Sequence, residues 1–322
     1  MAKTNLKLAV IMDPLHTINV KKDSTYAMLR EAHKKNWDIH VITTDKLFFK
    51  NNKYLAFSNK FKYESHDRNT NNPNWFNIEA EKEVDLTKFD IILFRKDPPV
   101  DLEYIYATFL LEQVANHGVL VANNPKSIRD CNEKLFATQF PEFSPPTLVT
   151  RDMNLIKEFQ QEHKEIIIKP LDSMGGNAIF KLKPNDSNNN VILETATNKG
   201  TKTIMAQKFI PEIKDGDKRI LMINGNHVHY GIKRIPDAHD HRGNLAANAT
   251  SQGFRINEYE HEICDRIGPV LREKGLHFVG LDVIGQYVTE INVTCPTCIQ
   301  EIDNLYSLNI AKSYLEELER ML

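Results

Sequence analysis

The chain has 322 residues, of which 41% are hydrophobic and 26% charged, so it holds enough apolar side chain for two or three packed units. Its 41 Lys and Arg nearly balance its 43 Asp and Glu, whereas a protein that binds duplex nucleic acid usually carries a basic excess. No apolar run reaches the roughly 18 residues of a membrane span. Four cysteines at this length are too few for a secreted disulfide framework and predict a cytoplasmic protein with reduced thiols.

The first third of the chain alternates strand and helix patterns. Strands are predicted at 7–12, 38–43, 89–94 and 119–122. Helices are predicted at 24–35, with Asp23 or Ser24 as N-cap, and at 104–117, with Gly118 just past the end. This rhythm predicts an open parallel sheet. Residues 50–74 are rich in Asn and Lys with poor periodicity, and predict an irregular excursion or a hairpin.

The middle third predicts short strands around a glycine loop. The strands are expected at 166–170, 178–182 and 203–210, with the loop at 172–176 and a polar turn at 183–190. Two short strands that flank such a loop favour an antiparallel lid over another βαβ unit.

The last third predicts more strands, two helices and one long loop. Strands are expected at 219–223 and 227–235, and a hairpin at 277–284 and 287–293. Residues 236–253 are polar and aperiodic, which is typical of a functional lid. A helix is predicted at 258–274, and an amphipathic helix at the end of the chain has one apolar side, made by Ile310, Tyr314, Leu315 and Leu318.

The glycine loop is the first candidate for phosphate chemistry. Gly175 and Gly176 lack side chains, so their backbone N–H groups can approach phosphate oxygens closely. No Gly-Lys-Ser/Thr follows, which excludes a Walker loop, and no helix pattern opens after it, which excludes a dinucleotide fingerprint. Taken alone, the loop is more typical of a hairpin turn than of a phosphate site.

Basic residues form the second set of candidates. Lys169 ends an apolar strand, where a charge must be paired or aimed into a cleft. Lys134, read alone, is typical of a solvated helix lysine. Four more basic residues adjoin the long loop, and arginines there could offset charge on a moving phosphoryl group or form an ordinary surface patch. These four are Lys218, Arg219, Lys233 and Arg234.

Carboxylate and amide side chains share the predicted C-terminal hairpin. Glu290 and Asn292 stand two apart on one strand, so they point to the same face, and Asp282 lies on the neighbouring strand. Oxygen groups that converge in this way suit Mg²⁺, because this ion prefers oxygen ligands and binds protein carboxylates and substrate phosphates at the same time. An alternative is that these carboxylates lie on an exposed sheet face and pair with lysines. The apolar flanking residues predict a buried sheet, and this favours the metal site.

Phrases along the whole chain carry a family resemblance. They lie at 12–14, 18–24, 97–99, 129–134, 168–172 with 175–176, 214–219, 242–247, 280–282 and 289–294. Together, and in this order, they resemble the family of bacterial glutathione synthetases, which are ATP-grasp ligases. The C-terminal phrases are shared across ATP-grasp ligases, whereas the N-terminal Met-Asp-Pro and Arg-Lys-Asp-Pro-Pro phrases narrow the resemblance to this family.

The resemblance implies a mixed α/β chain with the ATP-grasp fold in three domains. An N-terminal open parallel-sheet domain for substrate would span 1–130. A small central lid domain would span 131–206, and a C-terminal catalytic domain with the terminal helix would span 207–322. ATP would lie between the last two domains.

The resemblance also implies residue roles. Arg219 and Arg234 would face the transferring phosphate. Implied ATP-binding residues are Lys134, Lys169, Ser173, Met174, Gly175, Gly176, Gln207, Lys208, Phe209 and Ile210. Implied metal ligands are Asp282, Glu290 and Asn292. Implied substrate-binding residues are Asp13, Ser24, Arg95, Asp97, Asn292, Thr294 and Thr297.

The family reaction joins γ-glutamylcysteine to glycine, with ATP as co-substrate and Mg²⁺, or Mn²⁺ in its place, as cofactor. Phosphorylation gives the carboxylate a leaving group, and glycine then displaces phosphate from the acyl phosphate. A second lid at 236–253 would exclude water from this intermediate. The resemblance implies small-molecule partners, a homo-oligomer such as a tetramer, and neither nucleic acid nor membrane.

Two departures from the family stand out. Asn248 and Ala249 replace a pair of glycines, and Cys295 replaces a serine. The second change creates Cys295-Pro296-Thr297-Cys298, which resembles a glutaredoxin dithiol. Its place near the end of the chain is unlike a thioredoxin-like domain. A small pocket cysteine and a reversible dithiol switch are the two remaining interpretations.

Three alternative functions stay open from the sequence. One is another ATP-grasp carboxylate–amine ligase, such as a glutamate or alanine ligase. Another is a nucleotide-binding regulatory protein with ligase ancestry. The third is a zinc hydrolase, although no carboxylate or cysteine joins its histidines at a diagnostic spacing. These histidines are His227, His229, His239 and His241.

Overall fold

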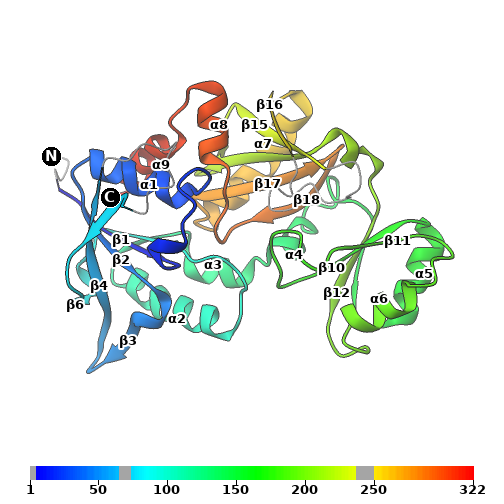
Figure 1. Cartoon of the computed structure of the whole chain (residues 1–322), viewed down its shortest axis with the longest axis horizontal. Coiled ribbons are helices and arrows are strands. Elements are labelled where there is room, and N and C mark those ends of the chain that lie inside the picture. Colours follow the sequence, from blue (N-terminus) through cyan, green and yellow to red (C-terminus); the bar gives the residue numbers. More distant parts are fainter. Residues whose placement is uncertain (1–4, 65–73, 237–249) are drawn as a thin grey trace.

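The structure is a computed structural model that describes residues 5–64, 74–236 and 250–322. It contains three sheets, with the N-terminal sheet at one end, the C-terminal sheet in the middle and a small sheet at the other end (Figure 1). Within these ranges no helix has both the length and the apolar character needed to cross a membrane.

The N-terminal sheet is parallel at its centre and antiparallel at one side. Its order is β3-β4-β2-β1-β7-β8, with β5 and β6 paired to β4. The pairs β1–β2, β1–β7 and β7–β8 are parallel, whereas β4 joins β2 in the antiparallel sense. The strands are β1 (Lys7–Met12), β2 (Asp38–Ile42), β3 (Leu47–Lys50), β4 (Lys53–Tyr63), β5 (Phe76–Ile78), β6 (Lys82–Asp85), β7 (Ile91–Arg95) and β8 (Leu120–Ala122).

The predicted parallel sheet therefore needs a correction. The stretch predicted as an irregular excursion or a hairpin contains β4, a strand of 11 residues that forms a hairpin with β3 and also pairs with β6 in the antiparallel sense. Most of its Lys and Asn side chains are exposed on the solvent side, and they hide the strand's apolar positions from a periodicity test. The sheet is mixed as a result.

The first predicted helix begins at its predicted cap, whereas the second begins two residues earlier than predicted. The Asp23 carboxylate accepts a hydrogen bond from Tyr26 N and starts α1 (Ser24–Lys34). The Asp101 carboxylate does the same for α2 (Leu102–Asn116) through Tyr104 N. Gly118 follows α2 with a φ of +92°, as expected of a glycine after a helix. The short α3 (Pro125–Asp130) leads into the middle of the chain.

The small unit is an antiparallel sheet with two helices. Its order is β11-β10-β12-β9, and the predicted antiparallel lid is confirmed. The strands are β9 (Thr147–Thr150), β10 (Ile166–Pro170), β11 (Phe180–Leu182) and β12 (Ile204–Lys208). The sequence predicted neither β9 nor α5 (Met153–His163) nor α6 (Asn189–Ala196), and the start of α6 overlaps the predicted polar turn.

The C-terminal sheet contains the predicted hairpin. Its order is β16-β15-β13-β17-β18, with β14 paired to β13. The strands are β13 (Asp217–Ile223), β14 (Asn226–His227), β15 (Tyr230–Ile235), β16 (Thr250–Arg255), β17 (Phe278–Ile284) and β18 (Tyr287–Asn292). The predicted long loop is too long by four residues, because 250–253 belong to β16. Residues 237–249, and with them the predicted lid, lie outside the described residues.

Four helices complete the C-terminal part. They are α4 (Glu133–Ala137), α7 (Glu258–Glu273), α8 (Ile299–Tyr306) and α9 (Ile310–Glu319). Helix α7 begins at a capping box, in which Asn257 and Glu260 exchange side-chain and backbone hydrogen bonds. The apolar side predicted for the last helix is confirmed, since all four of its residues are buried.

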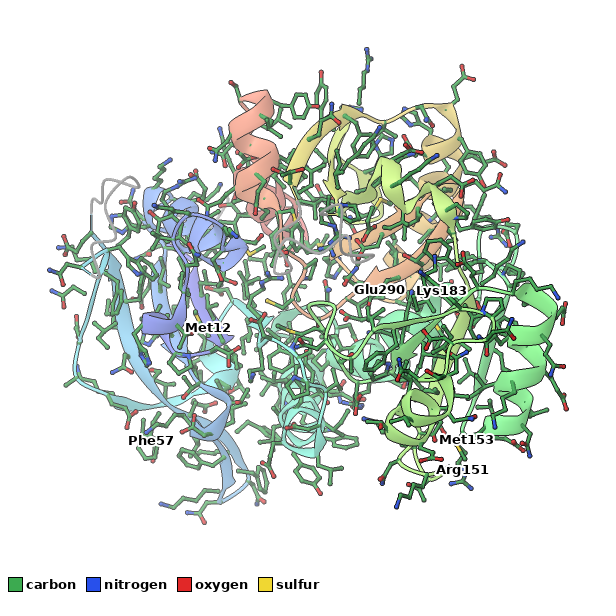
Figure 2. The ribbon with its side chains drawn as sticks, turned by 45° about the vertical axis from the view of Figure 1, so that its right-hand side comes forward. Met12, Phe57, Arg151, Met153, Lys183 and Glu290 are labelled. Atoms are coloured by element: carbon green, nitrogen blue, oxygen red, sulfur yellow. The ribbon has the colours of Figure 1, made fainter. Side chains whose placement is uncertain are left out.

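The hydrophobic cores join the two large sheets and leave the small one separate. In one cluster Ile11 of β1 is buried together with Leu281 of β17, and in another Leu8 is buried together with Leu315 of α9. The small unit has its own core, made by Ile156, Ile166, Ile168, Leu182, Leu193, Ile204 and Ala206. In Figure 2 the small unit lies beside the strand that carries Glu290. A large body and a small separate unit therefore face each other.

Candidate functional site

Charged side chains are aligned across neighbouring strands of the C-terminal sheet. Arg219 of β13 lies opposite Asp282 of β17, and Asp282 lies opposite Glu290 of β18. Asp217 of β13 lies opposite Arg234 of β15. Since strand residues two apart share a face, Asp217 and Arg219 point the same way. The strand register thus gathers five charges on one side of the sheet.

Two arginines hold Asp282 from both sides. Arg219 donates to it through two nitrogens, at 2.6 Å to Oδ1 and 3.0 Å to Oδ2, and Arg234 lies 3.0 Å from Oδ2. All three side chains are at most 6% exposed. Burial alone would raise the pKa of the Asp282 carboxyl, but the two guanidinium groups hold it well below its usual range.

Asp217 and Arg234 form an ion pair in which each side chain keeps one polar atom without a hydrogen-bond partner among the described residues. Arg234 donates to Asp217 Oδ2 at 2.5 Å, but burial raises the pKa of this carboxyl and the nearby Asp282 adds to the effect. Asp217 Oδ1 and Arg234 Nε are both buried, and neither has a hydrogen-bond partner in the described part of the chain. Buried polar atoms without partners are costly, so this end of the site is suited to a polar ligand.

Gly280 makes room for Arg219. A Cβ atom at Gly280 would lie 3.0 Å from Arg219 Cδ and 3.2 Å from its Nε. Asn292, its cross-strand neighbour, donates from Nδ2 to Gly280 O at 2.9 Å, which fixes the amide and leaves Oδ1 as an acceptor. Gly280 therefore leaves space for the Arg219 side chain and, through its carbonyl oxygen, orients the Asn292 amide.

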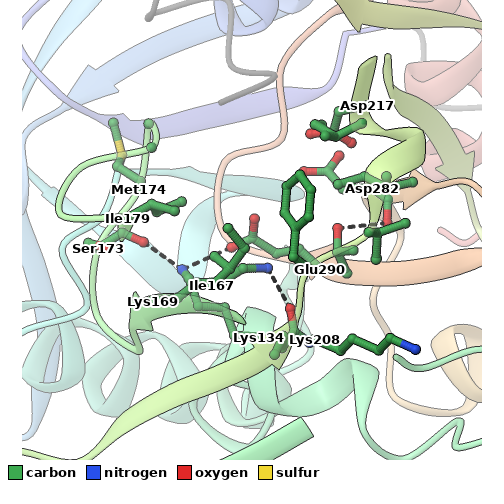
Figure 3. Close-up of a pocket in the computed structure, with 18 residues that line it drawn as sticks. Lys134, Ile167, Lys169, Ser173, Met174, Ile179, Lys208, Asp217, Asp282 and Glu290 are labelled. Carbon is green, nitrogen blue, oxygen red and sulfur yellow. Dashed lines mark hydrogen bonds and ion pairs between the residues drawn. The ribbon is translucent and has the colours of Figure 1, made fainter. Parts of the chain in front are cut away.

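The buried Lys134 and the half-buried Lys169 approach this face from other elements. Lys134 of α4 donates from Nζ to Ser173 O at 2.7 Å and pairs with Glu290 at 2.9 Å. Lys169 of β10 donates to Gln207 Oε1 of β12 at 2.6 Å. Burial lowers the pKa of Lys169. Burial also acts to lower the pKa of Lys134, but the carboxylates of Glu290, Glu133 and Asp172 together outweigh it and raise this pKa. Figure 3 shows both lysines and Glu290 in one pocket.

This junction pocket lies between the small sheet and the C-terminal sheet. It is lined by Lys134, Ile167, Lys169, Ser173, Met174, Gly175, Gly176, Ile179, Gln207, Lys208, Phe209, Ile210, Ile213, Asp217, Asp282, Ile284, Thr289 and Glu290. All ten residues predicted for ATP are among them. The lining combines isoleucines and the Phe209 ring with Lys134 and Lys169, which suits a ligand with a flat apolar part and an anionic part.

A second cavity, the arginine pocket, adjoins the first. It is lined by Asn19, Lys22, Asp23, Asp97, Pro98, Glu133, Met174, Gly175, Arg219, Arg234, Asp282, Glu290, Asn292, Thr294, Cys295, Pro296, Thr297 and Glu301. The two pockets share Met174, Gly175, Asp282 and Glu290. An anion held by the lysines of the first pocket therefore lies next to the arginines of the second.

Three of the predicted substrate residues lie behind the wall of the arginine pocket. Asp13 Oδ2 accepts a hydrogen bond from Asp97 N at 3.0 Å. Ser24 Oγ accepts one from Ile299 N at 3.3 Å. Arg95 donates to Pro296 O at 2.8 Å. The structure thus gives these three side chains contacts that support the wall, whereas Asp97, Asn292, Thr294 and Thr297 line the cavity itself.

The sequence analysis missed several residues that line the arginine pocket. Asn19 and Lys22 lie in a phrase that the analysis quoted without assigning them a role, and Asp23 was assigned only as a helix cap. Glu133 is the first residue of the short α4, and Glu301 lies in the first turn of the short α8. No local pattern identifies these side chains, because they meet only through the fold.

The dithiol motif has a defined position in this wall. All four cysteines are free. Cys295 Sγ donates to Arg95 O at 3.3 Å, while Cys298 is buried and caps α8 with a φ of +90°. Burial raises the pKa of both thiols. A raised pKa keeps a thiol protonated and unreactive.

The oxygen groups of this site fit a hard divalent cation. Asp282, Glu290 and Asn292 all line the arginine pocket. No group of three His, Cys, Asp or Glu side chains suited to a metal occurs among the described residues, and this gives no support to the zinc alternative. His239 and His241 lie outside that part of the chain. A cation of the Mg²⁺ type needs only one or two protein carboxylates, because it also takes substrate phosphates and water as ligands.

Comparisons with protein families and curated proteins agree over nearly the whole chain. The profile of the prokaryotic glutathione synthetase N-terminal domain matches residues 6–129, and that of the prokaryotic glutathione synthetase ATP-grasp domain matches residues 133–307. The chain is 48% identical over 318 residues to glutathione synthetase of Pseudomonas syringae pv. tomato, covering 99% of this chain and 98% of the relative. It is 46% identical over 318 residues to that of Vibrio vulnificus, covering 98% of both.

Solved structures show the same fold at low sequence identity. The D-cycloserine synthetase DcsG matches with a TM-score of 0.68 and 13% identity, over 98% of this chain and 99% of that one. The D-alanine–D-alanine ligase of Bacillus anthracis matches with a TM-score of 0.59 and 11% identity, over 98% and 96%. These likenesses show the fold alone.

Proposed function

This chain belongs to the prokaryotic glutathione synthetase family of ATP-grasp carbon–nitrogen ligases, and we propose that it joins γ-glutamylcysteine to glycine with consumption of ATP. Among the features of the site, the strongest support comes from the continuity of the two pockets. The junction pocket suits a nucleotide, with its base near the isoleucines and its phosphates near Lys134 and Lys169. Its last phosphate would then reach Arg219 and Arg234, where a carboxylate substrate would be bound.

The basic side chains give this arrangement its chemical logic. A carboxylate resists attack by an amine until one oxygen becomes a leaving group. Transfer of the terminal phosphoryl group from ATP would make that oxygen part of an acyl phosphate and release ADP. The amine of glycine then forms the C–N bond, phosphate departs with the C–O electron pair, and a proton leaves the nitrogen. Arg219 and Arg234 would offset the negative charge that develops on the transferred phosphoryl group and on the departing phosphate.

A divalent cation fits the same site, and we propose Mg²⁺, with Mn²⁺ as a substitute. Asp282, Glu290 and the free Oδ1 of Asn292 would hold it. When bound, the cation would neutralise phosphate charge during transfer. Glu290 is now paired with Lys134, and Asp282 with two arginines. Nucleotide binding would exchange these partners, because phosphates attract the same lysine and arginines.

The proposal is tested by following one oxygen atom. The cysteine carboxylate of γ-glutamylcysteine is labelled with ¹⁸O, and the purified protein is supplied with ATP, Mg²⁺ and glycine. An acyl phosphate passes one labelled oxygen to inorganic phosphate, which mass spectrometry detects along with glutathione. In control reactions each substrate is omitted in turn. In further reactions the peptide and glycine are both replaced, either by D-alanine or by glutamate.

The outcomes separate the candidate functions. Labelled phosphate in a one-to-one ratio with glutathione supports the proposal. Turnover with another amino-acid pair and none with γ-glutamylcysteine would identify a different carboxylate–amine ligase. ATP binding with no turnover of any pair would favour the regulatory protein.

A cytoplasmic location and a homo-oligomer belong to the same proposal. The four free cysteines support a reducing compartment. Leu102, Tyr106 and Phe109 of α2 are apolar, exposed and spaced along one helix face, which supports self-association. Sedimentation equilibrium of the purified chain measures its state, and a monomer at all concentrations would remove the oligomer from the proposal.

A further inference from the structure

Glu133 makes an unusual set of contacts beside the proposed metal site. One oxygen of its carboxylate, Oε1, accepts three hydrogen bonds from the chain just after β18. The donors are Val293 N at 2.8 Å, Thr294 N at 2.9 Å and Thr294 Oγ1 at 2.8 Å. Hydrogen bonds to a charged acceptor are stronger than those between neutral groups. The chain directly after Asn292 is therefore held firmly.

The first turn of α4 holds this strand at two points. Lys134, the next residue, pairs with Glu290 at 2.9 Å, so adjacent residues of α4 hold β18 on either side of Asn292. Asn123 adds a third contact, since its Nδ2 donates to Val293 O at 2.8 Å. The backbone of Val293 is thus held through both its nitrogen and its carbonyl oxygen by side chains from outside its sheet.

We propose that Glu133 is a positioning residue that holds the metal-binding amide of Asn292 and the hydroxyl of Thr294 in register with Lys134. The proposal rests on the proposed function, because it concerns the site for a metal–nucleotide complex. Glu133 would touch neither the metal nor the phosphates. It acts through the backbone at 293–294, as outer partners of a metal site orient the inner ligands.

The geometry explains why a carboxylate stands at this position. Three donors converge on one acceptor, and a neutral amide oxygen would hold them less strongly. The Thr294 hydroxyl uses its only hydrogen on Glu133, so its oxygen can face the arginine pocket only as an acceptor. Removal of the negative charge should therefore loosen the segment and leave its donors in place.

The test compares metal binding in Glu133→Gln with that in the parent. Mn²⁺ is titrated into the full chain with saturating ADP and without peptide substrate, and free Mn²⁺ is measured by electron paramagnetic resonance. We expect Mn²⁺ binding to weaken by about 10-fold, the size typical of losing an outer partner of a metal site. With Mg²⁺ kept saturating, kcat should fall while KM for ATP stays near the parental value. Glu142→Gln is the matched control, because within the described ranges Glu142 pairs with Arg266 alone, at the surface.

Mn²⁺ affinity within about twofold of the parent in Glu133→Gln would overturn the proposal, since the loss of an outer partner of a metal site should weaken metal binding by about 10-fold. If this variant does not fold, Thr294→Val removes only the hydroxyl donor and keeps both backbone bonds. It should weaken Mn²⁺ binding in the same direction, and unchanged binding would equally overturn the proposal. Neither readout uses γ-glutamylcysteine or glycine, so a failed assignment of those substrates stays distinguishable from a failed role for Glu133.

Discussion

Charged side chains at the site are held in pairs that a ligand can exchange. Lys134 and Glu290 form one such pair, and Asp282 shares its two oxygens between Arg219 and Arg234. A buried charge without a partner costs several kcal/mol, roughly 3–5 by mutational measurement, so these pairs stabilise the site when it is empty. A metal–nucleotide carries both signs of charge and can replace each partner without leaving a charge alone.

Glu290→Gln is predicted to abolish most turnover and leave the fold intact. The amide keeps the size of the side chain but removes one negative charge from the proposed cation site. A loss of about 3 kcal/mol of transition-state stabilisation corresponds to roughly 100-fold in kcat. Steady-state kinetics and circular dichroism measure the two effects, with Glu142→Gln as control. Near-parental turnover at moderate Mg²⁺ would contradict the role of Glu290 as a metal ligand.

At the scale of elements, one continuous stretch of chain builds much of the arginine pocket. Strand β18 carries Glu290 and Asn292, the segment 293–298 forms the wall, and α8 begins directly after it. Arg95 of β7 holds this wall through Pro296 O and through the thiol of Cys295. The dithiol motif is therefore built into a wall that the N-terminal sheet supports.

The structure makes the cysteines poor candidates for a redox switch, in contrast to the dithiol hypothesis. Because burial raises the pKa of both thiols, only a small fraction is thiolate at neutral pH, and thiolate is the form that reacts with oxidants. Mild hydrogen peroxide should therefore inhibit the parent and Cys295→Ser to the same small extent. Activity assays before and after dithiothreitol measure this. Reversible inhibition of the parent that Cys295→Ser abolishes would restore the switch.

At the scale of the whole molecule, the chain is one large body and one small unit. The two large sheets share both major hydrophobic clusters, whereas the small sheet relies on seven buried apolar residues. A small core buries little apolar surface and so contributes less stability. The junction pocket lies between the small unit and the large body, so a nucleotide there would contact both.

Hydrogen exchange is predicted to distinguish the two parts. Amides of β10 and β12 should exchange faster than those of β1 and β17, because the small unit opens at a lower free energy. A non-hydrolysable ATP analogue at about 100 times its Kd should add up to about 2.7 kcal/mol of protection to the small unit. Mass spectrometry of exchanged peptides measures both effects. Equal exchange in β10 and β17, or no protection by the analogue, would contradict this two-part view.

The sequence by itself determined those strands, helix ends and turns whose patterns lie within a few neighbouring residues. A short apolar run predicted β1, a capping residue predicted the start of α1, and Gly118 marked the end of α2. The pattern around 277–293 predicted the hairpin of β17 and β18. The two-residue spacing of Glu290 and Asn292 placed both on one face of that hairpin, and the charge at the end of an apolar strand marked Lys169 for a cleft. Residue roles came from the family resemblance, and the family itself is confirmed.

Only the tertiary structure decided which distant residues meet. Strand β4 was hidden because its exposed Lys and Asn side chains obscure the apolar positions that its neighbouring strands cover. Lys134 looked like a surface lysine until α4 packed against β18 and buried it beside Glu290. The carboxylate of Glu133 and the backbone of Thr294 have no pattern in common along the chain. Such contacts depend on packing between elements, which sequence periodicity does not encode.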